Sequence, residues 1–348
     1  MKDFGKIAII IVNWNGLKYL DNCFSSLSKQ SYKNVETIMV DNGSSDGSID
    51  FVKKKFPFVK IISLDKNYGY ARPNNVGIQE AFKDKKVKAI VALNNDTIVD
   101  KHWLEELVTT AFTNDDVGMV SSLAYFEGRK ELQNCGLSLE PSLKNTLEGG
   151  ISLAFGRKPA DVPQFLTEYE VFAAGGVAAL YKREMLEEIG LFDESYFAYN
   201  EDLDLGFRAR LYGWRALVSP KATLTHLHSR TGGAASAKKI YWMERNAYYT
   251  AIKNMPLTSL FAFPFRNLSL KLTLLRSKNP SVEKAKKNIS KAGLLILFLK
   301  VHLVVLSRLP ALLRARLKIQ RERKVSKASV KGWFLRFNRD TLENGYRK

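Results

Sequence analysis

The first 125 residues alternate between two patterns of hydrophobic and polar positions. Short apolar runs that end in turn residues predict β-strands at residues 6–13, 35–41, 59–64, 89–93 and 117–122. Between them, apolar residues spaced three or four positions apart predict helices at residues 17–28, 49–55, 74–82 and 102–112. Strands that alternate with helices form βαβ units, so we expect an α/β fold with a mostly parallel sheet flanked by helices.

The pattern weakens after this part of the chain. Residues 125–170 are poorly periodic and Gly-rich, which predicts an insertion that faces the substrate. Further on, the pattern predicts an apolar segment at residues 173–181, helices at residues 183–188 and 200–212, and a last strand entered through residues 213–218.

Charge divides the chain into two regions. The net charge is +19, but residues 1–237 carry 28 Lys and Arg against 30 Asp and Glu, whereas residues 238–348 carry 26 against 5. We therefore predict a catalytic domain at residues 1–237 and a helical, basic, membrane-associating region at residues 238–348. A basic tail favours a partner that carries phosphate, either a lipid headgroup or a nucleic acid.

Residues 293–313 (GLLILFLKVHLVVLSRLPALL) form a mostly apolar run, and a helix that spans a bilayer needs about 20 predominantly apolar residues. The apolar run is interrupted at Lys300, His302 and Arg308, and Pro310 is expected to end it. An amphipathic helix in the interface fits better, with the following bases reaching the headgroups of an anionic membrane surface. A packed helical domain is a second alternative, and nucleic acid is the least favoured partner because no nucleic-acid-binding motif is recognisable.

The expected compartment is the cytoplasmic face of a membrane, with the protein bound peripherally. The apolar run at residues 7–12 is too short and too β-branched for a signal peptide. Cys23 and Cys135 have no metal-ligand spacing, and two cysteines in 348 residues indicate a reducing compartment. We expect both to be buried as small hydrophobic residues.

Polar clusters follow two of the predicted strands, where a parallel sheet binds its ligands. In VDNGSSDGS (residues 40–48), the Asp41 carboxylate can accept the imide N–H of a uracil or thymine ring, although a turn and helix cap explains the same residues. In LNNDT (residues 93–97), one carboxylate and two amides suit a hard divalent cation that also binds diphosphate oxygens. A plain turn is the alternative there.

Acidic residues crowd the predicted helix at residues 200–212. Glu201, Asp202 and Asp204 lie at its start, where the helix dipole favours acids for purely structural reasons. Their neighbours are aromatic and apolar, so a raised pKa and general-base chemistry are the functional alternative. Arg208 follows Asp204 by four residues and can pair with it.

A late segment, THLHSRTGG (residues 225–233), holds two of the four histidines of the chain. His226 and His228 follow a predicted strand and point to opposite sides if the strand continues. At most one of them then serves a site, and a hydrogen-bonded histidine at a strand end is the alternative.

Seven motifs follow one another along the chain: IVNWNG, VDNGSSDGS, NYGYARPNNVG, LNNDT, AAGGVAALYKRE, GLFDESYFAYNEDLDLGFRARLYGW and THLHSRTGG. In this order, they resemble the motifs of family-two glycosyltransferases with the GT-A fold, most of all the rhamnosyltransferase-like branch. The resemblance spans residues 7–254. Each motif is weak alone, and the ordered set is specific.

The resemblance implies roles for individual residues. The implied nucleotide-sugar site consists of Val12, Asn13, Asn15, Asp41, Asn67, Gly69, Asn75, Asn94, Asn95 and Gly176. Within it, Asp41 would bind the base, and residues 67–69 would begin a loop that closes over the donor. Asn95 would lie near the ribose.

The resemblance also implies the chemistry. Asp96, the last residue of the family's DXD position, and His226 would bind Mn²⁺ or Mg²⁺, although Asn94 replaces the first acid and His228 competes with His226 for the role. Asp202 of the Glu201–Asp202 catalytic pair would be the general base of an inverting displacement. The expected donor is a nucleotide-sugar, with dTDP-rhamnose the favoured one, and the expected acceptor is a glycan or lipid-linked glycan used in polysaccharide or cell-wall synthesis. A non-catalytic protein that binds nucleotide-sugar or an acidic polymer is the alternative function, and the oligomeric state, a homo-oligomer included, is left open.

Overall fold

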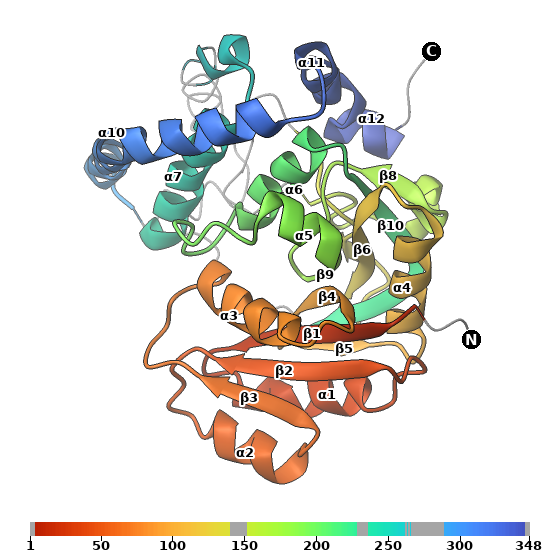
Figure 1. The fold of residues 1–348 in the computed structure, drawn as a ribbon. Helices are drawn as coiled ribbons and strands as arrows, with labels where there is room; N and C mark the ends of the chain where they lie inside the picture. The colour runs from red at the N-terminus through yellow and green to blue at the C-terminus, as the bar shows by residue number, and fades with distance from the viewer. Residues whose placement is uncertain are drawn as a thin grey trace.

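The computed structural model describes residues 4–139, 152–227, 236–261, 263, 265 and 289–344 (Figure 1). The strands are β1 (Lys6–Asn13), β2 (Val35–Asp41), β3 (Val59–Ser63), β4 (Val87–Asn94), β5 (Thr97–Val99), β6 (Val117–Phe126), β7 (Leu132–Asn134), β8 (Tyr169–Val171), β9 (Ala178–Lys182) and β10 (Arg215–His226). The helices are α1 (Leu17–Leu27), α2 (Ser48–Lys55), α3 (Ala71–Phe82), α4 (Trp103–Thr113), α5 (Arg183–Ile189), α6 (Glu201–Leu211), α7 (Ala237–Asn254), α10 (Lys291–Glu322), α11 (Lys327–Arg336) and α12 (Arg339–Asn344).

One mixed, mostly parallel sheet runs through the body of the protein. Its strand order is β3-β2-β1-β4-β9-β6-β10-β5, with β7 beside β6 and β8 beside β10. Strands β3, β2, β1 and β4 are parallel, and β9 runs antiparallel between β4 and β6. The predicted α/β fold with flanking helices is confirmed.

The register of the parallel strands brings polar residues to one edge of the sheet. Asn13 at the end of β1 pairs with Asp41 at the end of β2, and Val12 pairs with Asn94 at the end of β4. This is the edge at which open α/β sheets bind ligands.

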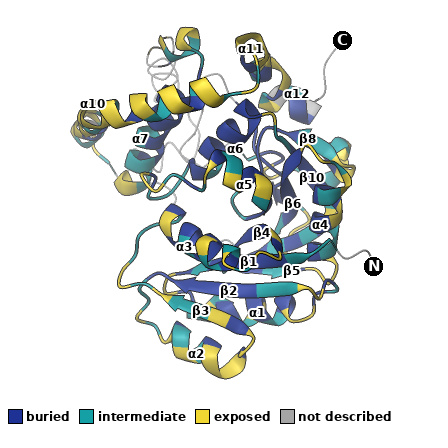
Figure 2. Cartoon of the chain, in the orientation of Figure 1, coloured by how far each residue is buried: buried dark blue, intermediate teal, exposed yellow. Residues whose placement is uncertain are grey.

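Both faces of the central strands are buried, as near-continuous apolar parallel strands require. In β1, Ala8 and Ile10 belong to one core cluster and Ile7, Ile9 and Ile11 to the other, because successive side chains point to opposite faces. Figure 2 shows this buried sheet between helices whose outer surfaces are exposed. Cys23 and Cys135 are free and buried, as predicted.

Strand β10 is the last strand that the sequence predicted. It continues to His226 and pairs with β6 on one side and with the short strand β5 on the other. The expected insertion at residues 125–170 contributes β7 and β8 to the sheet. The end of β10 is thereby fixed next to the turn that follows β4.

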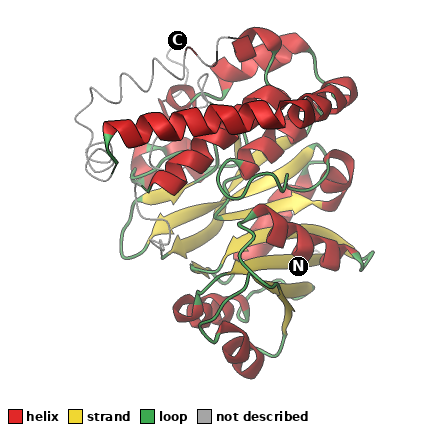
Figure 3. Cartoon of the chain, turned by 90° about the vertical axis from the view of Figure 1, so that its left-hand side faces the viewer, coloured by secondary structure: helices red, strands yellow, loops and turns green. Residues whose placement is uncertain are grey.

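The C-terminal helices pack against the sheet domain rather than away from it. Helix α7 contacts both α6 and α10. In Figure 3, α10 is the longest helix and crosses the side of the molecule that faces the viewer. Pro310, which interrupts the apolar run, lies inside this helix, and α10 continues to Glu322. Val305 and Leu312, on either side of Pro310, are buried in the core cluster, and their packing offsets the hydrogen bond that proline removes.

Candidate active site

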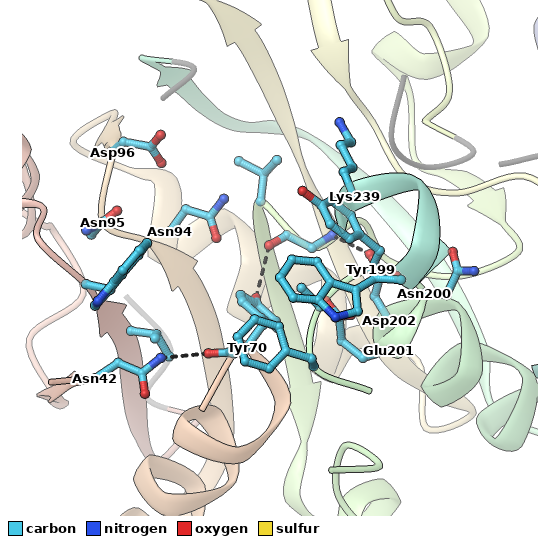
Figure 4. A pocket seen from close by; sticks show the side chains of 18 of the residues that line it. Asn42, Tyr70, Asn94, Asn95, Asp96, Tyr199, Asn200, Glu201, Asp202 and Lys239 are labelled. Atoms are coloured by element: carbon cyan, nitrogen blue, oxygen red, sulfur yellow. Dashed lines mark hydrogen bonds between the residues drawn. The ribbon is translucent and has the colours of Figure 1, made fainter. Parts of the chain in front are cut away.

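A cavity of about 630 Å³ lies at the carboxyl ends of β1 and β4. Its described lining comes from those strand ends, the loop before α3, the start of α6 and the first turns of α7. In Figure 4, the labelled residues form two sides. Asn94, Asn95 and Asp96 lie on one side, and Tyr199, Glu201, Asp202 and Lys239 lie on the other.

A chain of buried hydrogen bonds supports the first side. The Asp41 carboxylate accepts from Asn13 Nδ2 at 3.0 Å and from the backbone N–H of Ser44 at 2.9 Å, and Asp41 is only 1% exposed. Asn13 Oδ1 in turn accepts from Asn95 Nδ2 at 2.8 Å. Asp41 and Asn13 therefore lie behind the cavity lining and fix the side chain of Asn95 in it.

Asn42 connects the end of β2 to the loop before α3. Its Nδ2 donates to Asn67 Oδ1 at 3.1 Å and to the carbonyl of Gly69 at 2.8 Å, and its Oδ1 accepts from the Tyr68 N–H at 2.9 Å. Gly69 has a φ of 85°, and a Cβ there would lie 1.9 Å from the carbonyl oxygen of Phe197. Only glycine fits this approach, so the loop on the Asn94 side touches the segment that precedes α6.

Asp96 and His226 meet at the end of β10. His226 Nε2 lies 2.9 Å from Asp96 Oδ1, Nδ1 contacts Gln133 Oε1, and both residues are buried. Both ring nitrogens of His226 therefore contact a side-chain oxygen, one on Asp96 and one on Gln133.

This pair fits a divalent ion that shares its ligands with a substrate. No cluster of three or more acidic, histidine or cysteine ligands occurs among the described residues. One carboxylate and one imidazole leave most coordination positions for diphosphate oxygens and water, the usual arrangement for such ions at nucleotide sites. The Gln133 contact orients the ring as an outer-shell partner does for metal-bound histidines.

Glu201 and Asp202 begin helix α6. Asp202 Oδ1 accepts from the Leu203 N–H at 2.8 Å, and Oδ2 accepts from the Gly176 N–H at 3.1 Å. Burial raises the pKa of Asp202 to about 6 although these N–H groups lower it. Burial and then the charge of Asp202 raise the pKa of Glu201 to about 8. Both carboxyl groups thus have raised pKa values, as the sequence suggested for acids with apolar neighbours, and Asp202 is the more acidic of the two.

The backbone just before this pair is strained. Tyr199 and Asn200 have φ values of 73° and 68°, in the left-handed region that costs non-glycine residues about 1 kcal/mol each. Asn246 of α7 is fully buried, and its Nδ2 donates to the carbonyls of Ala198 at 2.8 Å and Tyr199 at 2.7 Å. Helix α7 thus holds the turn that presents Asp202.

A buried ionic network joins α6 to α7 behind the cavity. Asp204 pairs with Arg208 at 3.1 Å, as its spacing predicted, and with Lys253 of α7 at 2.8 Å. Asn254 Nδ2 donates to Asp204 Oδ1 at 2.8 Å, and Lys253 also pairs with Asp193 at 2.6 Å. Asp204 therefore fixes the position of α6 and does not face the cavity.

The first turns of α7 complete the second side of the cavity. Trp242 stacks on Phe197 with ring centroids 4.4 Å apart and planes at 19°. Lys238 and Lys239 also line the cavity. Trp242, Lys238 and Lys239 were not among the site residues predicted from the sequence. The one signal for them was the aromatic and basic composition past residue 236, which we attributed to membrane contact.

The structure gathers most of the site residues predicted from the sequence. Those that line the cavity are Val12, Asn15, Asn67, Gly69, Asn94, Asn95, Asp96, Gly176, Glu201, Asp202 and His226. Asn75 does not line it, because its Nδ2 donates to the carbonyl of Phe192 at 2.8 Å and its Oδ1 accepts from the Phe192 N–H at 3.1 Å, which ties α3 to the segment before α6. His228 lies outside the described residues.

Comparison with known proteins agrees with this geometry. Residues 8–190 match the family described as "Glycosyl transferase family 2". The chain is 23% identical over 264 residues to the N-acetylglucosaminyl-diphospho-decaprenol L-rhamnosyltransferase of Mycobacterium tuberculosis. This alignment covers 70% of this chain and 82% of the relative. It is 26% identical over 204 residues to a low-salt glycan biosynthesis hexosyltransferase of Haloferax volcanii, covering 59% of this chain and 61% of the relative.

Solved structures share the fold. GalNAc-T7, crystallised with UDP, GalNAc and Mn²⁺, aligns with a TM-score of 0.60 at 15% identity and covers 83% of this chain and 55% of its own. TarS 1–349 of S. aureus, in complex with UDP, aligns with a TM-score of 0.51 at 19% identity and covers 98% and 91%. The family match extends over more than half of the chain, so the protein belongs to glycosyltransferase family 2, has the GT-A fold and is a glycosyltransferase.

Proposed function

We propose that this glycosyltransferase inverts the sugar that it transfers, and that it moves rhamnose from dTDP-rhamnose to a lipid-linked glycan. The observation that carries the proposal is the position of Asp202, a half-buried carboxylate across the cavity from the Asp96–His226 pair (Figure 4). The similarity to a rhamnosyltransferase whose name specifies a lipid diphosphate acceptor supports this choice of donor and acceptor.

The proposed reaction is an in-line displacement. The acceptor hydroxyl donates its proton to Asp202 while its oxygen forms a bond to the anomeric carbon. The bond from that carbon to the diphosphate oxygen breaks on the opposite face, so the configuration inverts. Asp202 suits this step because its pKa, raised by burial to about 6, makes it ionised but more basic than an exposed aspartate.

Asp96 and His226 are the proposed ligands of Mn²⁺ or Mg²⁺, which would neutralise the charge that develops on the departing nucleoside diphosphate. Gln133 sets the orientation of the His226 ring. Asn95, fixed by Asn13, directly precedes Asp96 and lies on the same side of the cavity, where it would contact the ribose.

We further propose that α10 binds the protein to an anionic membrane at its cytoplasmic face. By length and composition, Ala292–Glu322 is apolar enough to cross a bilayer, and 17% of its most apolar window is buried. Its inner residues pack into the core, whereas leucines such as Leu299 and Leu303 on the outside are 56% and 67% exposed. Exposed bases, including Lys300 and Arg308, lie between them and complement anionic headgroups.

Sedimentation with phosphatidylglycerol vesicles tests this surface. Leu299→Ser/Leu303→Ser should lose most of the vesicle binding, whereas Leu166→Ser, an exposed leucine on another surface, should keep it. If both proteins sediment equally, the membrane surface lies elsewhere. If the double variant instead changes from dimer to monomer by light scattering, the face binds a second copy of the chain.

Release of nucleoside diphosphate from a panel of nucleotide-sugars tests the reaction. With Mn²⁺ and a membrane extract as the acceptor source, the wild type should turn over one donor and Asp202→Asn should not. Asp50→Asn, a variant of a helix α2 residue outside the cavity, is the matched control and should keep full activity. Nucleotide binding without turnover of any donor would favour a binding protein with a glycosyltransferase fold.

A further inference from the structure

Among the described residues that line the cavity, the lysines lie in one place. The described lining contains three acids, several amides and aromatic rings, but no arginine, and its lysines are Lys238 and Lys239. Both lie in the first turn of α7, beyond the part of the chain that matches the family. In the described lining, the two lysines therefore lie on an element outside the family match.

Aromatic rings hold both lysines on the Asp202 side of the cavity. Lys239 Nζ lies 5.3 Å from the centroid of the Tyr199 ring, and Tyr199 precedes the Glu201–Asp202 pair by two residues. Lys238 Nζ lies 4.9 Å from the Trp242 ring, which stacks on Phe197. Such contacts with aromatic rings pre-position the two ammonium groups.

The start of α7 adds to this positive field. The helix has 18 residues and no acid in its first turn, so its dipole is not offset there. Ser236 caps it by accepting from the Lys239 N–H at 3.2 Å. Helix N-termini of this kind favour phosphate groups, and here two lysine side chains accompany the helix.

Helix α7 also connects the cavity to the proposed membrane surface. Tyr248 of α7 contacts His302 of α10 through a hydrogen bond of 3.1 Å, and Arg316 of α10 donates to the Ile252 carbonyl of α7 at 2.8 Å. Helix α7 therefore contributes to the cavity lining at its start and packs against α10 further along.

We propose that Lys238 and Lys239 form a binding site for the phosphate or diphosphate of the acceptor, so that the enzyme selects phosphate-linked acceptors over neutral glycosides. This inference rests on the proposed function, since it assigns the acceptor that Asp202 deprotonates. The donor diphosphate shares the same chemistry, and the experiment separates the two.

The test compares Lys238→Gln/Lys239→Gln with the wild type on two acceptors. One is N-acetylglucosaminyl diphosphate on a short alkyl chain, and the other is the alkyl glycoside without the diphosphate. The variant should raise the KM of the diphosphate acceptor about 10- to 100-fold, because two charge-assisted contacts are lost. The KM of the neutral glycoside and of the donor should stay unchanged. Lys53→Gln/Lys54→Gln on the exposed face of α2 removes the same charge and should change none of them.

A rise in the donor KM, or an equal rise for both acceptors, would overturn the proposal and assign the lysines to the donor. A second measurement does not need turnover. Alkyl diphosphate is titrated into protein saturated with nucleoside diphosphate and Mn²⁺, and the double variant should bind it at least about tenfold more weakly than the wild type. Equal binding by the two proteins would refute the site. If the wild type transfers no sugar from any donor, the proposed function fails, and this titration still decides on the lysines.

Discussion

The substitution Asp202→Asn should remove activity and stabilise the protein at neutral pH. The reason is the cost of keeping this carboxylate ionised at the cavity wall. Burial raises its pKa from 3.8 to about 6 against the lowering effect of the Leu203 and Gly176 N–H groups. A base of this strength is useful to the reaction, but its charged form is disfavoured in the folded protein.

The sign and size of the effect follow from proton binding. The folded protein binds this proton more tightly than the unfolded chain does, so the free energy of unfolding falls as the pH rises from about 4 to about 6. The difference between the two pKa values corresponds to about 3 kcal/mol. Asparagine carries no charge, so this destabilisation is absent from the variant. Its side chain has one oxygen for the two N–H donors, and the lost hydrogen bond costs about 1 kcal/mol of stability. The variant should therefore be about 2 kcal/mol more stable near pH 7.5, and no more stable than the wild type near pH 4.

Urea unfolding followed by tryptophan fluorescence measures this difference at both pH values. Sugar transfer, measured in parallel, should fall about tenfold per pH unit below pH 6 in the wild type and be absent from the variant at every pH. A variant less stable than the wild type near pH 7.5, or a stability difference that does not change with pH, would refute the assignment of Asp202 as an ionised base with a raised pKa.

Further variants test the parts that support this carboxylate. Lys253→Met removes a buried cation shared by two carboxylates and should lower the free energy of unfolding by about 3 kcal/mol in urea, whereas a loss near zero would mean that the network is not formed. Gly176→Ala places a Cβ 2.9 Å from Asp202 Oδ2 and should lower kcat at least about tenfold with little change in the donor KM. Gln133→Leu should raise the Mn²⁺ concentration needed for half-maximal activity by about 10- to 100-fold, because His226 loses its orienting contact, and an unchanged requirement would count against His226 as a ligand.

The sheet was predictable because parallel strands leave a strong local signal. Both faces of β1 and β2 are buried, so these strands appear as continuous apolar runs, and the residues at which they end follow directly from the sequence. The rule that ligands bind at the carboxyl ends of such strands then brings Asn13, Asp41 and Asn94 together without knowledge of any long-range contact.

What the sequence did not show depends on contacts between distant residues. Asp41 ends a strand at the site edge, but Asn13 and Ser44 bind both of its oxygens, and no local pattern distinguishes this from an exposed carboxylate. Trp242 lies in a segment whose aromatic and basic composition suits a membrane surface and a cavity wall equally well. Amino-acid composition indicates that a surface is aromatic and basic, but it does not show whether a membrane or a ligand lies against that surface.

The dual role of α7 has a consequence for how the acceptor is selected. Through Asn246, this helix holds the strained turn at Tyr199 that presents Asp202, and through Lys253 it is locked to α6. The same helix carries Lys238 and Lys239 at its start. A displacement of α7 would therefore move the proposed phosphate site and the base together. Because Asn246 donates to two backbone carbonyls of the segment before Asp202, we expect the proposed base to keep its position only while α7 keeps its own, so that the proposed acceptor binding and proton removal depend on one helix.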